Sequence, residues 1–214
     1  MKDLVIIGAG GHGRELFVTV TAINAVAPTW NVLGFVDDAP EHLDRIERLG
    51  AKILGPISWL EENPTNYALG IGTSSVRRVL SQRVEAAGCT PTTIVHPGAH
   101  LGLDIRLAEG VVIYDRCTLT TNVSIGRHTH LNVGCDSDHD STVGHFVQFS
   151  PGIFVNGDCQ IEDDSYLGPG VIVGRGSMIH PRARVGAGAV VLSEVVADAM
   201  VVGMPARPRS VVLE

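Results

Sequence analysis

The residue of this chain best suited to acid–base chemistry is His139, which lies in a cluster of carboxylates. Asp138 and Asp140 flank it, and Asp136 precedes them. An imidazole beside a carboxylate can take a proton from a nucleophile, so this cluster is typical of general base catalysis. We therefore expect His139 and Asp140 to be catalytic, with His139 as the base and Asp140 as the group that tunes it.

A second candidate site follows the first apolar stretch of the chain. Gly8, Gly10 and Gly13 have the spacing G-x-G-x-x-G, which lets backbone N–H groups approach a phosphate at the start of a helix. His12 lies among them, and we expect it to be exposed, with its pKa lowered by the helix dipole, and able to donate to a polar ligand. Asp37–Asp38 end the next expected strand and could hold ribose hydroxyls or a base. The alternatives are a tight turn without a ligand and a solvated acidic loop.

The first ninety residues should form the frame for the glycine site. Short apolar runs predict four strands, and the stretches between them predict helices. Strands that alternate with helices indicate a parallel sheet with ligands beyond the carboxyl ends of its strands. Because this domain is half of a two-lobed dinucleotide fold, a nucleoside diphosphate fits better than NAD. The expected strands are 4–7, 32–36, 51–54 and 67–71, and the expected helices begin near 14 and span about 40–49, 56–62 and 74–88.

The rest of the chain follows a period of six. An aliphatic or aromatic residue falls on every sixth position from Val95 to Val191, with Ser137 as the one exception. Four residues after each of these positions comes a second column of small or apolar residues, from Ala99 to Val195. A slip of one residue would expose the whole core, so chance is a poor explanation. The pattern predicts a parallel β-helix with three six-residue steps in each coil.

This register brings His139 beside a glycine. Residues eighteen apart should occupy the same corner of successive coils, about 4.8 Å apart. Thr121, His139 and Gly157 form such a stack, which leaves room for a ligand beside the imidazole. The Gly157 N–H is our candidate donor to an oxyanion. The one break in the pattern, Ser137, coincides with the polar cluster, as functional sites often do.

Histidines also raise the possibility of a metal. His128, His130, His139 and His145 could bind zinc between the subunits of a trimeric β-helix. The register places His139 and His145 at different corners and the other two at other positions, so we expect no metal site. We expect His128, His130, His145 and His180 to lie on the surface.

Composition limits the remaining possibilities. The chain has 214 residues, 44% of them hydrophobic, which is enough for two modest cores. Its net charge of -7 argues against a nucleic-acid groove or a basic membrane-binding surface. The sequence shows neither a signal peptide nor an apolar run of about 18 residues, so we expect a cytoplasmic protein without membrane insertion. The cysteines should be reduced and packed as small hydrophobic residues: Cys89, Cys117, Cys135 and Cys159.

Several motifs together carry a family resemblance that covers nearly the whole chain. They are Gly8–Gly13, Phe35–Asp38, Ala68–Gly72, Asp138–Asp140, Gly144–Gly152 and Val202–Arg207. With these motifs the chain resembles the nucleotide-sugar N-acetyltransferases of the bacterial hexapeptide-repeat superfamily, which act on UDP-4-amino-4,6-dideoxy sugars. The sialic acid O-acetyltransferases are relatives of this group.

The resemblance implies a Rossmann-like α/β half domain over residues 1–92 that binds the nucleotide sugar. It implies a left-handed β-helix with a C-terminal cap over residues 93–214 that binds acetyl-CoA between the subunits of a homotrimer. The nucleotide pocket would be lined by Gly10, Gly11, His12, Asp37, Asp38 and Gly72, with Asn132 near the sugar. Acetyl-CoA would contact Gln148, Gly157, Pro169 and Ala187. Gln148 stands where the family often has a second histidine, so it can donate a hydrogen bond but cannot transfer a proton. Relatives tend to carry Asn where this chain has Thr73, which bears on the identity of the base.

The chemistry of the residues agrees with this activity. A sugar amine must lose a proton before it attacks a thioester, and His139 is placed to take that proton. The Gly157 N–H would stabilise the tetrahedral oxyanion, and the coenzyme A thiolate would then leave. We expect N-acetylation of a nucleotide-linked 4-amino-4,6-dideoxy sugar, with UDP as the nucleotide, in the synthesis of bacterial surface glycans or glycoproteins. The alternatives are a sugar O-acetyltransferase of the sialic acid type, which needs a stronger base, and a non-catalytic nucleotide-binding regulatory protein.

Overall fold

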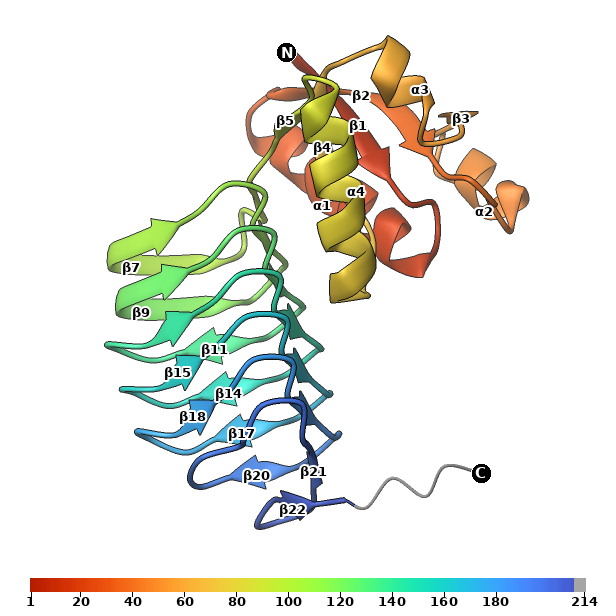
Figure 1. The fold of residues 1–214 in the computed structure, drawn as a ribbon. Coiled ribbons are helices and arrows are strands. Elements are labelled where there is room, and N and C mark those ends of the chain that lie inside the picture. The colour runs from red at the N-terminus through yellow and green to blue at the C-terminus, as the bar shows by residue number, and fades with distance from the viewer. Residues whose placement is uncertain (210–214) are drawn as a thin grey trace. The chain divides into compact units, whose positions relative to one another are not determined.

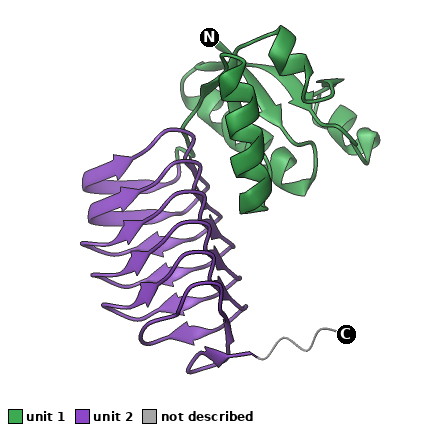
Figure 2. Cartoon of the chain, in the orientation of Figure 1, with its two compact units in different colours: residues 1–97 green, residues 98–214 purple. Residues whose placement is uncertain are grey.

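The chain forms two compact units, which we describe one at a time. A computed structural model describes residues 1–209, and it divides the chain into Met1–Pro97 and Gly98–Glu214 (Figure 2). The end of the expected C-terminal cap, residues 210–214, lies outside the described residues. No helix between residues 1 and 209 combines the length and the apolar character needed to cross a membrane.

The first unit is a parallel sheet with helices between its strands, as expected, but it has five strands where the sequence predicted four (Figure 1). Its strand order is β3-β2-β1-β4-β5, so the chain moves to opposite sides of β1 and creates a switch point between β1 and β4. The strands of this sheet are β1 (Lys2–Ile7), β2 (Trp30–Val36), β3 (Ile53–Gly55), β4 (Asn66–Leu69) and β5 (Thr90–Pro91). The short strand β6 (Ile94–Val95) also falls within Met1–Pro97 but is not part of this sheet. The helices are α1 (Gly11–Val26), α2 (Leu43–Arg48), α3 (Trp59–Glu62) and α4 (Ser74–Ala86).

Helix α1 begins at Gly11, three residues earlier than the sequence suggested. The predicted start was late because its first turn contains glycines, which have poor helix propensity. A side chain at Gly13 would collide with the backbone of Gly8, and one at Gly70 would collide with the backbone of Gly13. These glycines therefore let α1 pack closely on the ends of β1 and β4. The buried side chains of Leu16 and Val20 continue this contact along α1.

The second unit is the parallel β-helix that the period of six predicted (Figure 1). Its three faces are the sheet β8-β10-β13-β16-β19-β21-β22, the strands β11-β14-β17-β20, and the strands β12-β15-β18. Partners from β7 to β20 differ by eighteen residues, as in His130 with Gln148, which confirms three six-residue steps per coil. In the last coil the spacing shortens to sixteen, as in Arg184 with Met200. The strands are β7 (His100–Leu107), β8 (Val112–Ile113), β9 (Thr118–Ile125), β10 (His130–Leu131), β11 (Asp136–Ser137), β12 (Thr142–Val143), β13 (Gln148–Phe149), β14 (Phe154–Val155), β15 (Gln160–Ile161), β16 (Tyr166–Leu167), β17 (Ile172–Val173), β18 (Met178–Ile179), β19 (Arg184–Val185), β20 (Val190–Val191), β21 (Met200–Val202) and β22 (Arg207–Pro208).

The two predicted columns fill the interior of this prism. The first is buried at every position from Ile113 to Val191, and the second from Val111 to Val195. The prediction fails in the first coil, where Leu101 is 36% exposed. The strand that carries Leu101, β7, pairs only with β9 among the described strands, so this coil lies at an open end of the sheet.

The corners of the prism share one backbone conformation. Every sixth residue from Asp104 to Gly188 has a positive φ, and Asp140 is one of them at 61°. Such residues turn the chain sharply between short strands, and Asp and Asn tolerate the conformation better than most side chains. At each corner, the residue that precedes the positive-φ residue therefore lies on an edge of the prism, as His139 does before Asp140.

Candidate active site

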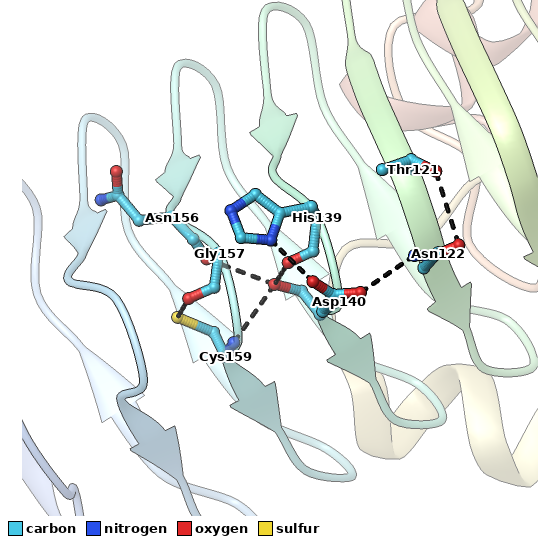
Figure 3. A network of polar contacts seen from close by, with 8 residues as sticks. Thr121, Asn122, His139, Asp140, Asn156, Gly157 and Cys159 are labelled. Carbon is cyan, nitrogen blue, oxygen red and sulfur yellow. Dashed lines mark hydrogen bonds and ion pairs between the residues drawn. The ribbon is translucent and has the colours of Figure 1, made fainter.

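His139 and Asp140 form a hydrogen-bonded pair in the turn between β11 and β12. The His139 Nδ1 atom lies 2.8 Å from Asp140 Oδ2, and Asn122 donates from its Nδ2 to Asp140 Oδ1 at 3.0 Å (Figure 3). The bond from Asn122, followed by the contact with His139, holds the pKa of Asp140 below its usual range. An ionised Asp140 accepts a hydrogen bond from Nδ1–H, which leaves the Nε2 lone pair of His139 available as a base.

The imidazole of His139 lies directly against Gly157 in the next coil. A Cβ atom at position 157 would come within 2.5 Å of both Cε1 and Nε2 of the ring. The backbone holds this register, because Asp158 N–H donates to the His139 carbonyl at 2.9 Å and Gly176 N–H donates to the Gly157 carbonyl at 3.1 Å. The side chain of His139 is 46% exposed, so its ring has one face on Gly157 and another open to solvent.

Gly157 is buried beneath that ring, and its N–H makes no hydrogen bond within residues 1–209. Two side chains stabilise the turn around it. The Ser141 hydroxyl donates to the Asn156 carbonyl at 3.2 Å and accepts from the Cys159 N–H at 3.2 Å. Asn156 itself donates to the Val173 carbonyl at 2.8 Å. These supports were not predicted from the sequence. Asn122 was not predicted either, although its spacing of eighteen from Asp140 is a readable signal.

Ser137 contributes to the core of the prism and not to this edge. It is fully buried, and its Oγ has no hydrogen-bond partner among the described residues. The break in the six-residue pattern is therefore next to the polar cluster in sequence, while its side chain points inward.

Three of the expected ligand residues lie on another edge of the β-helix. Asn132 follows β10, Pro169 follows β16 and Ala187 follows β19, whereas His139 follows β11 and Gly157 follows β14. Pro169 and Ala187 are exposed, and the buried Asn132 uses its Oδ1 to accept the Val133 N–H at 2.7 Å. A single copy of the chain therefore does not bring all the expected acetyl-CoA residues to one edge.

Gln148 lies on β13, which belongs to a face that does not carry His139. Its side chain is 5% exposed, and its Nε2 donates to the Phe149 carbonyl of the same chain at 2.9 Å. The amide that we expected to contact acetyl-CoA is thus already bound to the backbone.

In the first unit, the glycine turn and its neighbours meet at the carboxyl ends of β1, β2 and β4. A Cβ at Gly10, Gly11 or Gly72 would have no atom within 4 Å, so the backbone is open to a ligand at all three. Asp37 accepts the Ala9 N–H through Oδ2 at 2.8 Å and the Ala39 N–H through Oδ1 at 2.9 Å.

Asp38 accepts the Ile57 N–H through Oδ1 at 2.8 Å. Both aspartates that were expected to hold a ribose or a base therefore hold loops of their own domain. Their remaining lone pairs are the part that a ligand could use.

His12 differs from the expectation, because its side chain is only 16% exposed. Burial, followed by the charge of Arg77, lowers the pKa of His12 to about 4. The direction of the shift is as expected, but burial is its main cause, not the helix dipole. Arg77 is fully buried on α4 and donates from Nη1 to the carbonyls of Ile71 and Gly72 at 2.9 and 2.8 Å. This arginine was not predicted from the sequence.

Two of the four histidines expected on the surface are buried instead. His128 is 1% exposed and His130 is 0% exposed. The ring of His128 packs on Gly110 and lies 5.1 Å from the ring of Phe146, and these two residues are its neighbours at a spacing of eighteen. No group of three or more His, Cys, Asp or Glu side chains in the described part of the chain could hold a metal ion. All four cysteines are free and buried.

Comparisons with known proteins agree with this architecture. Residues 3–84 match the PglD N-terminal domain, and residues 158–193 match the bacterial transferase hexapeptide (six repeats). The chain is 31% identical over 179 residues to GDP-perosamine N-acetyltransferase of Escherichia coli O157:H7, a match that covers 82% of this chain and 80% of that protein.

Solved structures from Caulobacter crescentus and Acinetobacter baumannii cover 98% of the chain. A histidine-substituted variant of perosamine N-acetyltransferase from Caulobacter crescentus, in complex with CoA and GDP-perosamine, is 25% identical with a TM-score of 0.89, and 98% of it is covered. WeeI from Acinetobacter baumannii AYE is 28% identical with a TM-score of 0.85, and all of it is covered. The chain belongs to the acetyl-CoA-dependent nucleotide-sugar N-acetyltransferases of the hexapeptide-repeat superfamily.

Proposed function

We propose that this protein transfers the acetyl group of acetyl-CoA to the amine of a GDP-linked sugar of the 4-amino-4,6-dideoxy class. The observation that carries the proposal is the His139–Asp140 pair, whose Nδ1 contact leaves the Nε2 atom of a half-exposed imidazole free. GDP replaces the UDP of our sequence analysis, because the relatives from Escherichia coli and Caulobacter crescentus are described with GDP-perosamine.

In this reaction His139 accepts a proton from the sugar nitrogen at Nε2. The nitrogen forms a bond to the thioester carbon, and the carbonyl oxygen becomes an oxyanion. Asp140 stabilises the imidazolium through Nδ1, as its own hydrogen bond from Asn122 keeps it ionised. The carbon–sulfur bond then breaks, and coenzyme A leaves as a thiolate that needs little acid assistance. The unbonded Gly157 N–H remains our candidate donor to the oxyanion.

The nucleotide part of the substrate is assigned to the first unit. The diphosphate would contact the open backbone at Gly10 and Gly11, where the N–H groups of the first turn of α1 have no partners within the helix. His12, Asp37 and Gly72 line the same end of the sheet. A neutral His12 is suited to this position because it can donate or accept a hydrogen bond.

A homotrimer is part of the proposal. The edges that carry His139 and Pro169 flank the same face, formed by β11, β14, β17 and β20. That face exposes Phe154 by 48% and Ile172 by 39%. Contact between copies across this apolar face would bring the Pro169 edge of one protomer to the His139 edge of its partner. We assign the reaction to the cytoplasm.

The test compares two histidine variants with matched chemistry. His139→Asn should lower kcat by about 10²- to 10⁴-fold, which is the typical contribution of a general base. His145→Asn is the control, because His145 holds the same turn position one hexad later on another edge. Turnover is followed as thiol release from acetyl-CoA with GDP-, UDP- and dTDP-linked amino sugars, and the mass of each preparation is measured in solution.

Near-normal turnover by the His139 variant at saturating acetyl-CoA would overturn the role of the base. A preference for the UDP-linked sugar would overturn the assignment of GDP as the nucleotide. Transfer to a sugar hydroxyl would overturn the assignment of N-acetylation. A monomeric mass in solution would overturn the proposed trimer.

A further inference from the structure

The His139 edge continues beyond Gly157 to a cation that the mechanism does not use. Arg175 lies eighteen residues after Gly157, so it occupies the same corner one coil further along. The hydrogen bond from Gly176 N–H to the Gly157 carbonyl, at 3.1 Å, holds these two turns together. His139, Gly157 and Arg175 therefore follow each other along one edge, with about 10 Å between the Cα atoms of the first and the last.

Arg175 is exposed and has no ion pair or hydrogen bond within residues 1–209. Other arginines of the β-helix are engaged: Arg182 contacts Asp198 at 2.6 Å, and Arg106 contacts Asp104 at 3.2 Å. Arg175 is also the one Lys or Arg in the turns that form this edge, which are residues 120–123, 138–141, 156–159, 174–177 and 192–195.

The charges around Arg175 make it a favourable position for a phosphate group of an anionic cosubstrate. The whole chain carries a net charge of -7, and acidic side chains gather at the His139 end of the edge, at Asp136, Asp138, Asp140 and Asp158. Acetyl-CoA carries its phosphates at the far end of the pantetheine arm from the thioester. With the thioester at His139, the phosphates are repelled from these carboxylates and attracted to a guanidinium further along the edge.

We propose that Arg175 binds a phosphate group of acetyl-CoA, so that the cosubstrate lies along the edge from His139 over Gly157 to Arg175. This inference rests on the proposed function, because it takes His139 as the reacting end. The lack of a side chain at Gly157 also matters for this binding mode, because a side chain there would block the surface between the His139 imidazole and Arg175 on which the cosubstrate lies. Arg175 has a second effect, in that its charge helps to keep the pKa of Asp140 low, and the test must separate the two.

The test compares two acetyl donors. Acetyl-pantetheine has the same thioester arm as acetyl-CoA and no phosphate. In Arg175→Gln the KM for acetyl-CoA should rise about tenfold, the typical effect of losing one hydrogen bond to a charged group. The kcat, the KM for the nucleotide sugar and the kcat/KM with acetyl-pantetheine should stay near their original values. Arg175→Lys should recover part of the affinity.

Arg182→Gln is the matched control, because it removes the same charge from another edge of the same β-helix and should leave the KM for acetyl-CoA unchanged. An unaltered preference for acetyl-CoA in Arg175→Gln would overturn the proposal while leaving the proposed function intact. An equal loss with both donors would show that Arg175 acts through Asp140, and a rise in the KM for the nucleotide sugar alone would place the phosphate contact on the other substrate. Failure of the unaltered protein to transfer acetyl from either donor would instead refute the proposed function.

Discussion

The two candidate ligand sites of this protein use their polar side chains in opposite ways. At the glycine turn of the first unit, Asp37 and Asp38 are hydrogen-bonded to their own backbone, and Arg77 is buried beneath the loop after β4. At the His139 edge of the β-helix, the Nε2 atom of the imidazole and the exposed side chain of Arg175 make no hydrogen bond or ion pair with any residue from 1 to 209. The first site offers a ligand mainly backbone, whereas the second offers side chains.

This contrast follows from how each fold closes its turns. In the α/β unit, loops of varied length must be fixed by side chains, and carboxylates that accept backbone N–H groups do this. In the β-helix, the repeated turn and the ladder between coils satisfy the backbone, so side chains at the corners are left over for chemistry. Substitutions of the polar side chains at the two sites should therefore act differently: those at the glycine turn should change stability, and those at the His139 edge should change turnover.

The largest expected effect concerns His12, whose pKa in the folded protein is about 4. Below its ordinary value of 6.5 the unfolded chain binds a proton that the folded chain does not. The stability from this group is therefore complete above pH 6.5 and is lost as the pH falls toward 4, by a total of about 3 kcal/mol. The free energy of unfolding of His12→Gln should lack this loss, as measured by denaturant titration at pH 7.5 and at pH 4.

His42→Asn provides the control, because His42 is an exposed histidine of the same unit and Asn tolerates its positive φ of 53°. If the His12 variant lost as much stability in acid as the original protein, burial of His12 would not be the cause.

The second effect concerns Gly157 and should appear in turnover alone. In Gly157→Ala the new methyl group would meet the far end of the His139 side chain, which can rotate away, so the fold should keep its thermal midpoint. The displaced imidazole would no longer face the substrate, and kcat should fall about a hundredfold, as expected for a catalytic group moved by an ångström or more. Steady-state kinetics measure the expected fall in kcat, and a thermal melt measures the expected unchanged midpoint.

Gly72→Ala is the control, because it places a methyl group in open space at a glycine without a positive φ. Gly152→Ala would not serve, because Gly152 has a positive φ that strains any side chain. Gly72→Ala should keep kcat and change only the KM for the nucleotide sugar. A Gly157 variant with full turnover would show that the imidazole does not need its present position.

Much of the fold could be predicted, because burial in a β-helix repeats strictly and a period of six is visible in one sequence. The same register placed His139 beside Gly157 and would have linked Asn122 to Asp140. The sequence could not reveal His128 and His130 as buried, since a polar residue gives no apolar signal even when a neighbouring coil covers it. Arg77 and the bonds of Asp37 were equally hidden, because they depend on tertiary contacts between loops that no periodicity describes.

The smallest effect concerns Ser137, where the sequence suggested a functional defect and the structure shows an inward hydroxyl. Its buried Oγ lacks a hydrogen-bond partner within the described chain, so Ser137→Ala should remove a desolvation cost and raise the free energy of unfolding by about 1 kcal/mol. Ser177 has the same property in a later coil, and Ser177→Ala should gain a similar amount. Both variants should keep the turnover of the original protein, because neither side chain reaches the edge that carries His139. A loss of turnover confined to Ser137→Ala would show instead that the hydroxyl positions the adjoining turn, and that the polar break in the core belongs to the site after all.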